Sequence, residues 1–252
     1  MSVPLTDQAI AKIKDLIISG EFTAGSKLPR EQDLAARLGL SRNSLREAVR
    51  ALALIGVLDT RVGDGTYVTS LDADLLSTGM GFVGDLLDPS MLLEVSQVRR
   101  MLEPVATGQA ATRLREEDFL ALEACLEKMD TVETTQAFID ADTEFHRVIV
   151  TASGNATLAS IIQSLSGGLL RARLWRTFTD HGSIDVTRQR HRDIYNALRA
   201  GDAERASAAD LIHLSESDGW LRRMIATGEK PGRFKTDARD PGQPLVSEQA
   251  IA

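Results

Sequence analysis

The sequence has little cysteine, no long hydrophobic run and no excess of positive charge. The single cysteine, Cys125, excludes a disulfide framework, and its helical spacing with Leu122 and Met129 predicts a core residue in a reducing compartment. No apolar run approaches the roughly 20 residues of a membrane span. The opening residues Met-Ser-Val-Pro are not those of a signal peptide. We therefore expect a cytoplasmic protein with no membrane association.

The lack of excess positive charge argues against a nucleic-acid partner. The argument changes when the charge is counted separately for the two parts of the chain. The net charge is −7, whereas a DNA-binding protein must neutralise phosphates with Lys and Arg. Residues 1–70 nevertheless contain nine Lys and Arg against eight Asp and Glu, and residues 71–252 contain twenty against twenty-eight. Between Lys27 and Arg61 there are seven basic and four acidic residues. The acidity belongs to the second part, and the local charge of the first part suits DNA.

Length and composition predict two globular domains. The chain has 252 residues, of which 43% are hydrophobic and 26% charged, ordinary values for a soluble protein with a buried core. The predicted organisation is a small domain over 1–70, a linker or first helix over 71–89, an all-helical domain over 90–228 and a tail over 229–252. The tail contains three prolines and no periodicity, which predicts disorder.

Three short helices are predicted in the N-terminal segment. Apolar residues at helical spacing predict the first from Asp7 to Ser19. A second follows Pro29 and ends at Gly39, which suits the left-handed turn at a helix end. Ser41 is a good N-cap for the third, whose apolar residues recur at i, i+3, i+4 and i+7. This order predicts a helix-turn-helix.

The third predicted helix carries a polar face opposite its apolar one. Arg42, Arg46 and Arg50 recur at every fourth position, and Asn43 and Ser44 lie near the N-terminal end. Arginine can bridge guanine O6 and N7, asparagine can pair with adenine, and serine can hold phosphate. The alternative is a solvated basic face, which is the commoner role of three surface arginines alone.

A predicted β-hairpin directly follows the helix-turn-helix and favours the DNA-binding interpretation. Two β-prone runs, residues 57–62 and 66–69, surround a Gly-Asp-Gly turn, as in the wing of a winged helix. The stretch KLPREQDLAARLGLSRNSLREAVRALALIGVLDTRVGDGTYV resembles the DNA-binding domain of GntR-type regulators over nearly its whole length.

The resemblance implies which residues contact operator DNA. The positions that touch the operator in that family are matched by Ser41, Arg42, Asn43, Ser44 and Arg46. Gly65 matches the wing tip that approaches the minor groove. Gln32 stands where the family commonly has an arginine contact, and Arg30 is a candidate to replace part of it.

The rest of the sequence carries almost no strand signal. Caps, periodic apolar residues and Gly or Pro stops mark six or seven helices. The clearest predicted helices are 90–114, 116–132, 135–152, 155–178, 184–200 and 202–227. Pro104 predicts a kink in the first of them. The predicted fold class is therefore mostly α, with an N-terminal winged helix-turn-helix and a C-terminal all-α helical bundle.

Three of the four histidines lie where they invite a metal ion. Asp142 and His146 are one helical turn apart, so both side chains leave the same face, and His191 and His213 lie on two later predicted helices. Each also has an ordinary interpretation, as a surface pair, a residue of a charged run or a hydrogen-bonded core histidine. His181 falls in a predicted loop.

A second resemblance favours the metal. The segments DTEFHRVIVTASGNATL, HRDIYNALRAGDAERA and LIH resemble FCD, the ligand-binding domain of the FadR-type branch of GntR regulators, over most of residues 90–225. It implies that Asp142, His146, His191 and His213 bind one divalent metal ion. Three imidazoles and one carboxylate suit zinc, nickel or manganese, of which we expect zinc first. An ion with more than four ligands would leave positions for oxygen atoms of a carboxylate.

The same resemblance implies an effector and an assembly. Relatives respond to organic or sugar acids, so we expect a small carboxylate effector. Arg99, Arg171 and Arg173 are candidate anchors because guanidinium binds carboxylate bidentately, with surface salt bridges as the alternative. The expected assembly is a homodimer on inverted-repeat operator DNA, acting as a repressor that the ligand releases.

Two other functions fit a metal-binding domain. In a metal-responsive regulator the effector would be the ion itself. In a metal-dependent hydrolase an open coordination position would activate water. No activated nucleophile, Gly-rich phosphate loop or paired carboxylate accompanies the predicted ligands, so we expect no enzymatic activity.

Overall fold

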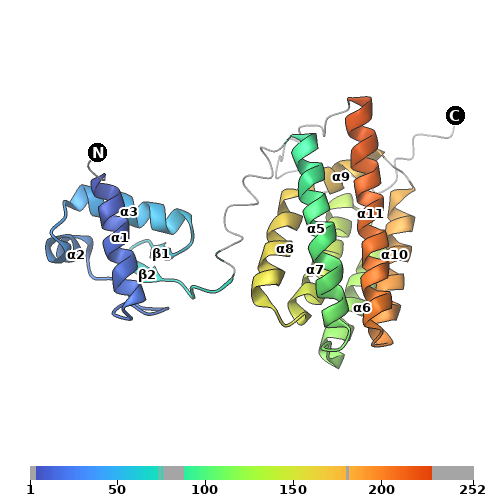
Figure 1. The fold of residues 1–252 in the computed structure, drawn as a ribbon, viewed down its shortest axis with the longest axis horizontal. Helices are drawn as coiled ribbons and strands as arrows, with labels where there is room; N and C mark the ends of the chain where they lie inside the picture. The colour runs from blue at the N-terminus through green and yellow to red at the C-terminus, as the bar shows by residue number, and fades with distance from the viewer. Residues whose placement is uncertain (1–3, 74, 76–87, 180–181, 229–252) are drawn as a thin grey trace. The chain divides into compact units, whose positions relative to one another are not determined.

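The computed structural model describes residues 4–73, 75, 88–179 and 182–228 (Figure 1). The chain divides into two compact units, residues 1–78 and 79–252. Part of the predicted linker, His181 and the predicted tail lie outside the described residues. No helix among those described is long and apolar enough to cross a membrane.

The N-terminal unit contains the predicted helix-turn-helix. Its helices are α1 (Leu5–Ile18), α2 (Glu31–Leu38) and α3 (Arg42–Leu54). Gly39 ends α2 in the left-handed conformation with φ of 65°, which costs glycine little. The Ser41 hydroxyl caps α3 by accepting a 3.0 Å hydrogen bond from the Ser44 backbone N–H. Both helix-end predictions are confirmed.

The predicted wing is a two-stranded antiparallel sheet. Strand β1 (Leu58–Arg61) pairs with β2 (Gly65–Val68), with Leu58 opposite Val68. Both of these side chains are buried in one core with the apolar faces of the three helices. The wing is therefore held by the same core as the helix-turn-helix.

The described part of the second unit is entirely helical. Its helices are α5 (Pro89–Ala110), α6 (Glu116–Thr131), α7 (Thr135–Ala152), α8 (Ala156–Gly168), α9 (Leu170–Thr179), α10 (Ser183–Arg199) and α11 (Ala203–Thr227). The single helix predicted over 155–178 is wrong, because two helices occupy this stretch. They divide at Leu169, directly after Gly167 and Gly168, whose low helix propensity weakens the continuous helix. The first helix passes through Pro104 and ends four residues earlier than predicted.

The helices of this unit pack side by side around a buried apolar core. Helices α5 and α11 run next to each other (Figure 1), α10 packs against α11, and α6 packs against α7. Leu122, Cys125, Met129 and Phe145 lie in the main core cluster, which confirms the predicted core position of the cysteine. This packing places one face each of α7, α10 and α11 toward a common interior.

Candidate metal centre and DNA-binding surface

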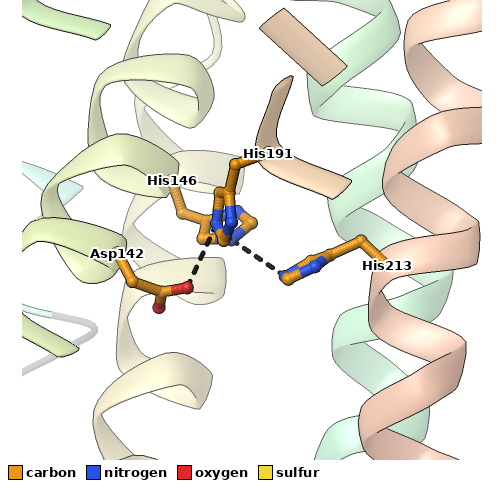
Figure 2. A group of neighbouring side chains, drawn as sticks. All are labelled: Asp142, His146, His191 and His213. Atoms are coloured by element: carbon orange, nitrogen blue, oxygen red, sulfur yellow. Dashed lines mark hydrogen bonds and ion pairs between the residues drawn. The ribbon is translucent and has the colours of Figure 1, made fainter. Parts of the chain in front are cut away.

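Four side chains from three helices converge in the interior of the helical unit (Figure 2). Helix α7 contributes Asp142 and His146, α10 contributes His191, and α11 contributes His213. All four residues are at most 6% exposed. Their ligand atoms lie within 4.8 Å of one another, close enough to hold one metal ion. The structure thus brings together the four residues for which the sequence predicted a shared site.

The histidine ring nitrogens face one another at short distances. His146 Nε2 lies 3.2 Å from His213 Nε2 and 3.2 Å from His191 Nε2. His191 Nε2 is also 3.1 Å from Asp142 Oδ1. Three imidazole nitrogens and one carboxylate oxygen therefore point to one place.

The opposite nitrogens of two of these rings have fixed partners. His191 Nδ1 is 2.7 Å from the backbone carbonyl oxygen of Thr187, so it must donate its proton there. His146 Nδ1 is 2.6 Å from Glu103 Oε1 and donates in the same way. In the neutral rings both Nε2 atoms then carry lone pairs, and they face each other and the Asp142 carboxylate. One divalent cation would bind all of these acceptors at once, so the donor set fits a metal ion.

Burial keeps two of the imidazoles, His191 and His213, in the form that metals bind. Burial and the neighbouring His146 lower the pKa of His191 well below its usual value of 6.5. Burial and His191 lower the pKa of His213 in the same direction. Both rings are therefore neutral at pH 7, which metal coordination requires.

A buried ionic network lies behind the metal ligands. The Arg99 guanidinium pairs with Glu103, one turn along α5, and donates a 3.1 Å hydrogen bond from Nη2 to Oε1. Burial alone would raise the pKa of Glu103, but Arg99 and His146 lower it further than burial raises it. Asp210 accepts a 2.8 Å hydrogen bond from the Thr107 hydroxyl, and burial together with Glu103 raises its pKa to about 7. Glu103 therefore remains charged and orients His146.

The sequence analysis missed Glu103 and Thr187. A signal for Glu103 was present, because it stands one helical turn after the singled-out Arg99. Its contact with His146 depends on the packing of α5 against α7, which no local pattern shows. Thr187 acts through its backbone carbonyl, so its side-chain identity carries no signal.

The candidate effector arginines fall in three different situations. Arg99 is buried and lines a cavity next to Asp142 and His213. Arg173 lines the same cavity and forms an ion pair with Asp142. Burial and the nearby Arg99 lower the pKa of Arg173 to about 9, so it stays charged at neutral pH in a place that favours a further anion. The side chain of Arg171 lies outside the described part of the chain.

The cavity is open toward the metal ligands. It spans about 670 Å³ of space that protein atoms do not fill, its mouth included. Its walls come from α5, α7, α9, α10 and α11 and from Leu169 between α8 and α9. A small molecule could therefore contact the arginines and the metal ligands together.

The predicted DNA-contacting residues lie mainly on the surface of the first unit. Those with exposed side chains are Arg30, Gln32, Ser41, Arg42, Asn43 and Arg46. Arg46 Nε forms a 3.1 Å ion pair with Glu31, and half of its side chain is exposed. Ser44 is 9% exposed, and its hydroxyl lies 2.8 Å from that of Ser41. Its burial favours a structural role in the helix cap over the predicted DNA contact.

The wing tip is built around Gly65. Its φ is 143°, and a Cβ there would lie 2.7 Å from Lys27 Cε, so both conformation and space favour glycine. Lys27 Nζ is 2.8 Å from Asp64 Oδ1, and the Tyr67 hydroxyl donates a 2.8 Å hydrogen bond to Asp64 Oδ2. The Arg61 guanidinium lies 4.3 Å from the centre of the Tyr67 ring. Arg61 on the hairpin and Lys27 beside it thus place two cations near the braced tip.

A winged helix-turn-helix joined to a helical unit with an internal ligand cavity defines a one-component transcription regulator. The chain matches the model of bacterial regulatory proteins of the gntR family over residues 5–68 and that of the FCD domain over residues 94–216. The chain therefore belongs to the GntR family of transcription regulators, in the branch with an FCD effector domain, and not to a family of enzymes.

Known proteins resemble the chain over most of its length. The HTH-type transcriptional regulator LutR of Bacillus subtilis is 30% identical over 82% of this chain and 96% of that protein. The galactonate operon transcriptional repressor of Escherichia coli is 27% identical over 89% of this chain and all of that protein. The solved structure of Streptococcus agalactiae GntR aligns with a TM-score of 0.58 and 26% identity, covering 85% of this chain and 99% of that one. Both units are thus shared with regulators.

Proposed function

We propose that this protein is a metal-containing repressor that a small organic or sugar acid releases from operator DNA. The observation that carries the proposal is the convergence of Asp142, His146, His191 and His213 beside an arginine-lined cavity, in a chain whose other unit is a winged helix-turn-helix. Such a regulator works on chromosomal DNA, so we infer a cytoplasmic location.

We infer that the ion is zinc, with nickel and manganese as the next candidates. Neutral imidazoles and one carboxylate form a ligand set that these ions share. When bound, the ion supplies a Lewis acid that can take a carboxylate oxygen of the effector in a remaining coordination position. In the structure Asp142 pairs with Arg173. If Asp142 binds the metal ion instead, the Arg173 guanidinium is able to bind the carboxylate of the effector.

We further infer that the DNA-binding surface acts in pairs. Exposed Arg42 and Asn43 on α3 would read base edges in the major groove, while Lys27 and Arg61 would lie near phosphates beside the wing. A single short recognition helix reads few base pairs, so a homodimer on an inverted repeat supplies the specificity. The effector changes DNA affinity only if it binds one arrangement of the dimer more tightly than the other.

The test combines metal content with DNA binding. Protein purified without chelator or affinity tag is analysed for metal, and its operator affinity is measured by fluorescence anisotropy with and without candidate acids. We expect about one equivalent of metal per subunit. His191→Ala and His213→Ala should lose nearly all of it, while His181→Ala, at the histidine outside the predicted ligand set, serves as the control.

The outcomes separate the possible functions. Loss of metal together with loss of the acid response in His191→Ala and His213→Ala supports the proposal. Full metal content in both variants would show that the histidines have only a structural role. Release from DNA by chelation, with no effect of any acid on the metal-loaded protein, would instead identify a metal-responsive regulator.

Sedimentation of the complex tests the homodimer, and a monomer bound tightly to one half-site would contradict it.

A further inference from the structure

The cavity beside the metal ligands has two chemically different ends. At one end Arg99, Asp142, Arg173 and His213 present charge and metal-binding atoms. At the other end the walls are Leu169, Ala172, Trp220 and Leu221, each at most 8% exposed and all members of one apolar cluster. A molecule that fills the cavity therefore contacts charge at one end and hydrocarbon at the other.

Three of the five hydroxyl groups that line the cavity among the described residues are engaged within the protein. Ser96 donates a 2.5 Å hydrogen bond to Asp218. Thr177 donates a 3.0 Å hydrogen bond to the backbone carbonyl of Arg173. Ser217 accepts a 2.8 Å hydrogen bond from Arg176. The hydroxyls of Ser183 and Thr187 are the two in the described lining that these contacts do not occupy.

Among the described residues of the same walls, amide side chains and lysine are missing and acids are scarce. Among the described residues that line the cavity there is no Asn, Gln, Glu or Lys, and Asp142 is the only acid. Against the apolar end, several hydroxyl groups on a ligand would lose their hydrogen bonds to water and find few partners among Leu169, Ala172, Trp220 and Leu221, which opposes binding. The charged end therefore suits a carboxylate group, and the apolar end suits a hydrocarbon chain better than a polyol chain.

We infer that the effector is a monocarboxylate with a compact apolar body, aliphatic or aromatic, rather than a polyhydroxylated sugar acid. The carboxylate lies at the charged end, between Arg99, Arg173 and the metal ligands. The apolar body lies against Leu169, Ala172, Trp220 and Leu221. This inference rests on the proposed function, because it takes the cavity as the effector site and narrows the class of acid.

Hexanoate and gluconate form a matched pair of probes. Both have six carbons and one carboxylate, and gluconate carries a hydroxyl on each of the other five. Isothermal titration calorimetry on the full-length, zinc-loaded protein measures both, with acetate as the short reference. Each buried methylene adds roughly fourfold in affinity, so hexanoate should bind on the order of 100-fold more tightly than acetate. Gluconate should bind at least about 10-fold more weakly than hexanoate.

Substitutions at the apolar end locate the effect. Leu221→Asn should remove most of the preference for hexanoate over gluconate. Ala172→Ser is a milder change at the same end and should reduce that preference about threefold even if Leu221→Asn fails to fold. Ala197→Ser is the matched control, because Ala197 is fully buried in the main core and does not line the cavity. It should leave the ratio unchanged.

The results distinguish this inference from the proposed function. A preference for hexanoate that falls in Ala172→Ser and persists in Ala197→Ser supports the apolar effector. Gluconate binding as tightly as hexanoate, with either acid releasing operator DNA, overturns the apolar effector and leaves the carboxylate-responsive repressor standing. If no acid binds the zinc-loaded protein or changes its DNA affinity, the proposed function itself fails.

Discussion

The two units of this protein differ in where they place ion pairs. The ion pairs described in the N-terminal unit lie at the surface, whereas the helical unit has buried pairs as well as exposed ones. In the N-terminal unit the ion pairs Lys27–Asp64 and Arg46–Glu31 lie at the surface, with between 42% and 51% of each side chain exposed. In the helical unit the Arg99–Glu103 pair has side chains only 6% and 0% exposed. The helical unit thus has exposed pairs of the same kind, such as Arg192–Asp130, and adds a pair in its interior.

This difference fits what each unit is proposed to bind. An exposed ion pair contributes little stability, so its arginine can exchange the carboxylate for a DNA phosphate at small cost. A buried pair has lost its hydration and holds its position only while both partners are present. Such a pair can orient His146 for a metal ion, which a solvated pair on flexible side chains would not do.

The largest effect should come from breaking the buried pair. Glu103→Ala leaves Arg99 charged in the interior and removes the acceptor of His146 Nδ1, so we expect a loss of about 3–5 kcal/mol in the free energy of unfolding. Both tryptophans of the chain, Trp175 and Trp220, belong to the helical unit, so urea titrations followed by tryptophan fluorescence report on this unit.

The exposed pair provides the matched control for that experiment. Glu31→Ala breaks the Arg46–Glu31 pair and should cost less than about 1 kcal/mol, measured by amide hydrogen exchange in α2 and α3. It should also leave operator binding intact or tighter, because Arg46 is released. Equal losses of stability in Glu31→Ala and Glu103→Ala would show that burial makes no difference to the cost of breaking an ion pair in this protein.

The next effect concerns DNA affinity. Arg42→Ala removes an exposed side chain from the recognition helix without touching its apolar face, and a lost bidentate base contact should cost about 1–3 kcal/mol of binding. Fluorescence anisotropy on operator DNA at fixed salt measures the change. Arg192→Ala is the control, since Arg192 pairs with Asp130 on the surface of the helical unit and should leave DNA binding unchanged.

The pH dependence of stability should come mainly from the helical unit. His191 and His213 have lowered pKa values when folded, so below pH 6.5 the unfolded chain binds protons that the folded chain does not, and stability falls. Asp210, with its pKa raised to about 7, keeps a proton when folded and acts in the opposite direction. The net effect is one proton, a loss of about 1.4 kcal/mol per pH unit as pH falls from about 6 to 5.

Asp210→Asn sharpens this measurement. It removes the opposing proton, so the loss should rise to about 2.7 kcal/mol per pH unit in the same range. Urea titrations of chelator-treated protein between pH 5 and 7.5 give both slopes. Identical slopes in the two proteins would contradict the assignment of a buried proton to Asp210.

The smallest predicted effect lies in the N-terminal unit. Ser41→Ala removes the cap hydroxyl of α3 and the partner of the Ser44 side chain, and should cost about 1 kcal/mol of stability. Hydrogen exchange of the first amides of α3 measures the loss. Ser19→Ala, at an exposed serine after α1, should change nothing in α3.

Local features of the fold could be predicted from the sequence because their causes lie within a few residues. Gly39 ends α2 and Ser41 caps α3 through contacts inside one turn. Two β-prone runs around a Gly-Asp-Gly turn are the local signature of a hairpin. The break at Gly167 and Gly168 was equally local, although the prediction ran a single helix through it.

The sequence by itself determined the winged helix-turn-helix, the helical second unit and the pairing of Asp142 with His146, since helical periodicity alone places those two on one face. It joined His191 and His213 to that pair only through resemblance, because no local rule connects residues on separate helices. Tertiary structure decided that these rings meet, that Glu103 orients one of them and that Ser44 is buried. The physical reason is that hydrogen bonds within a helix are local, whereas burial and charge pairing depend on which helix faces pack together.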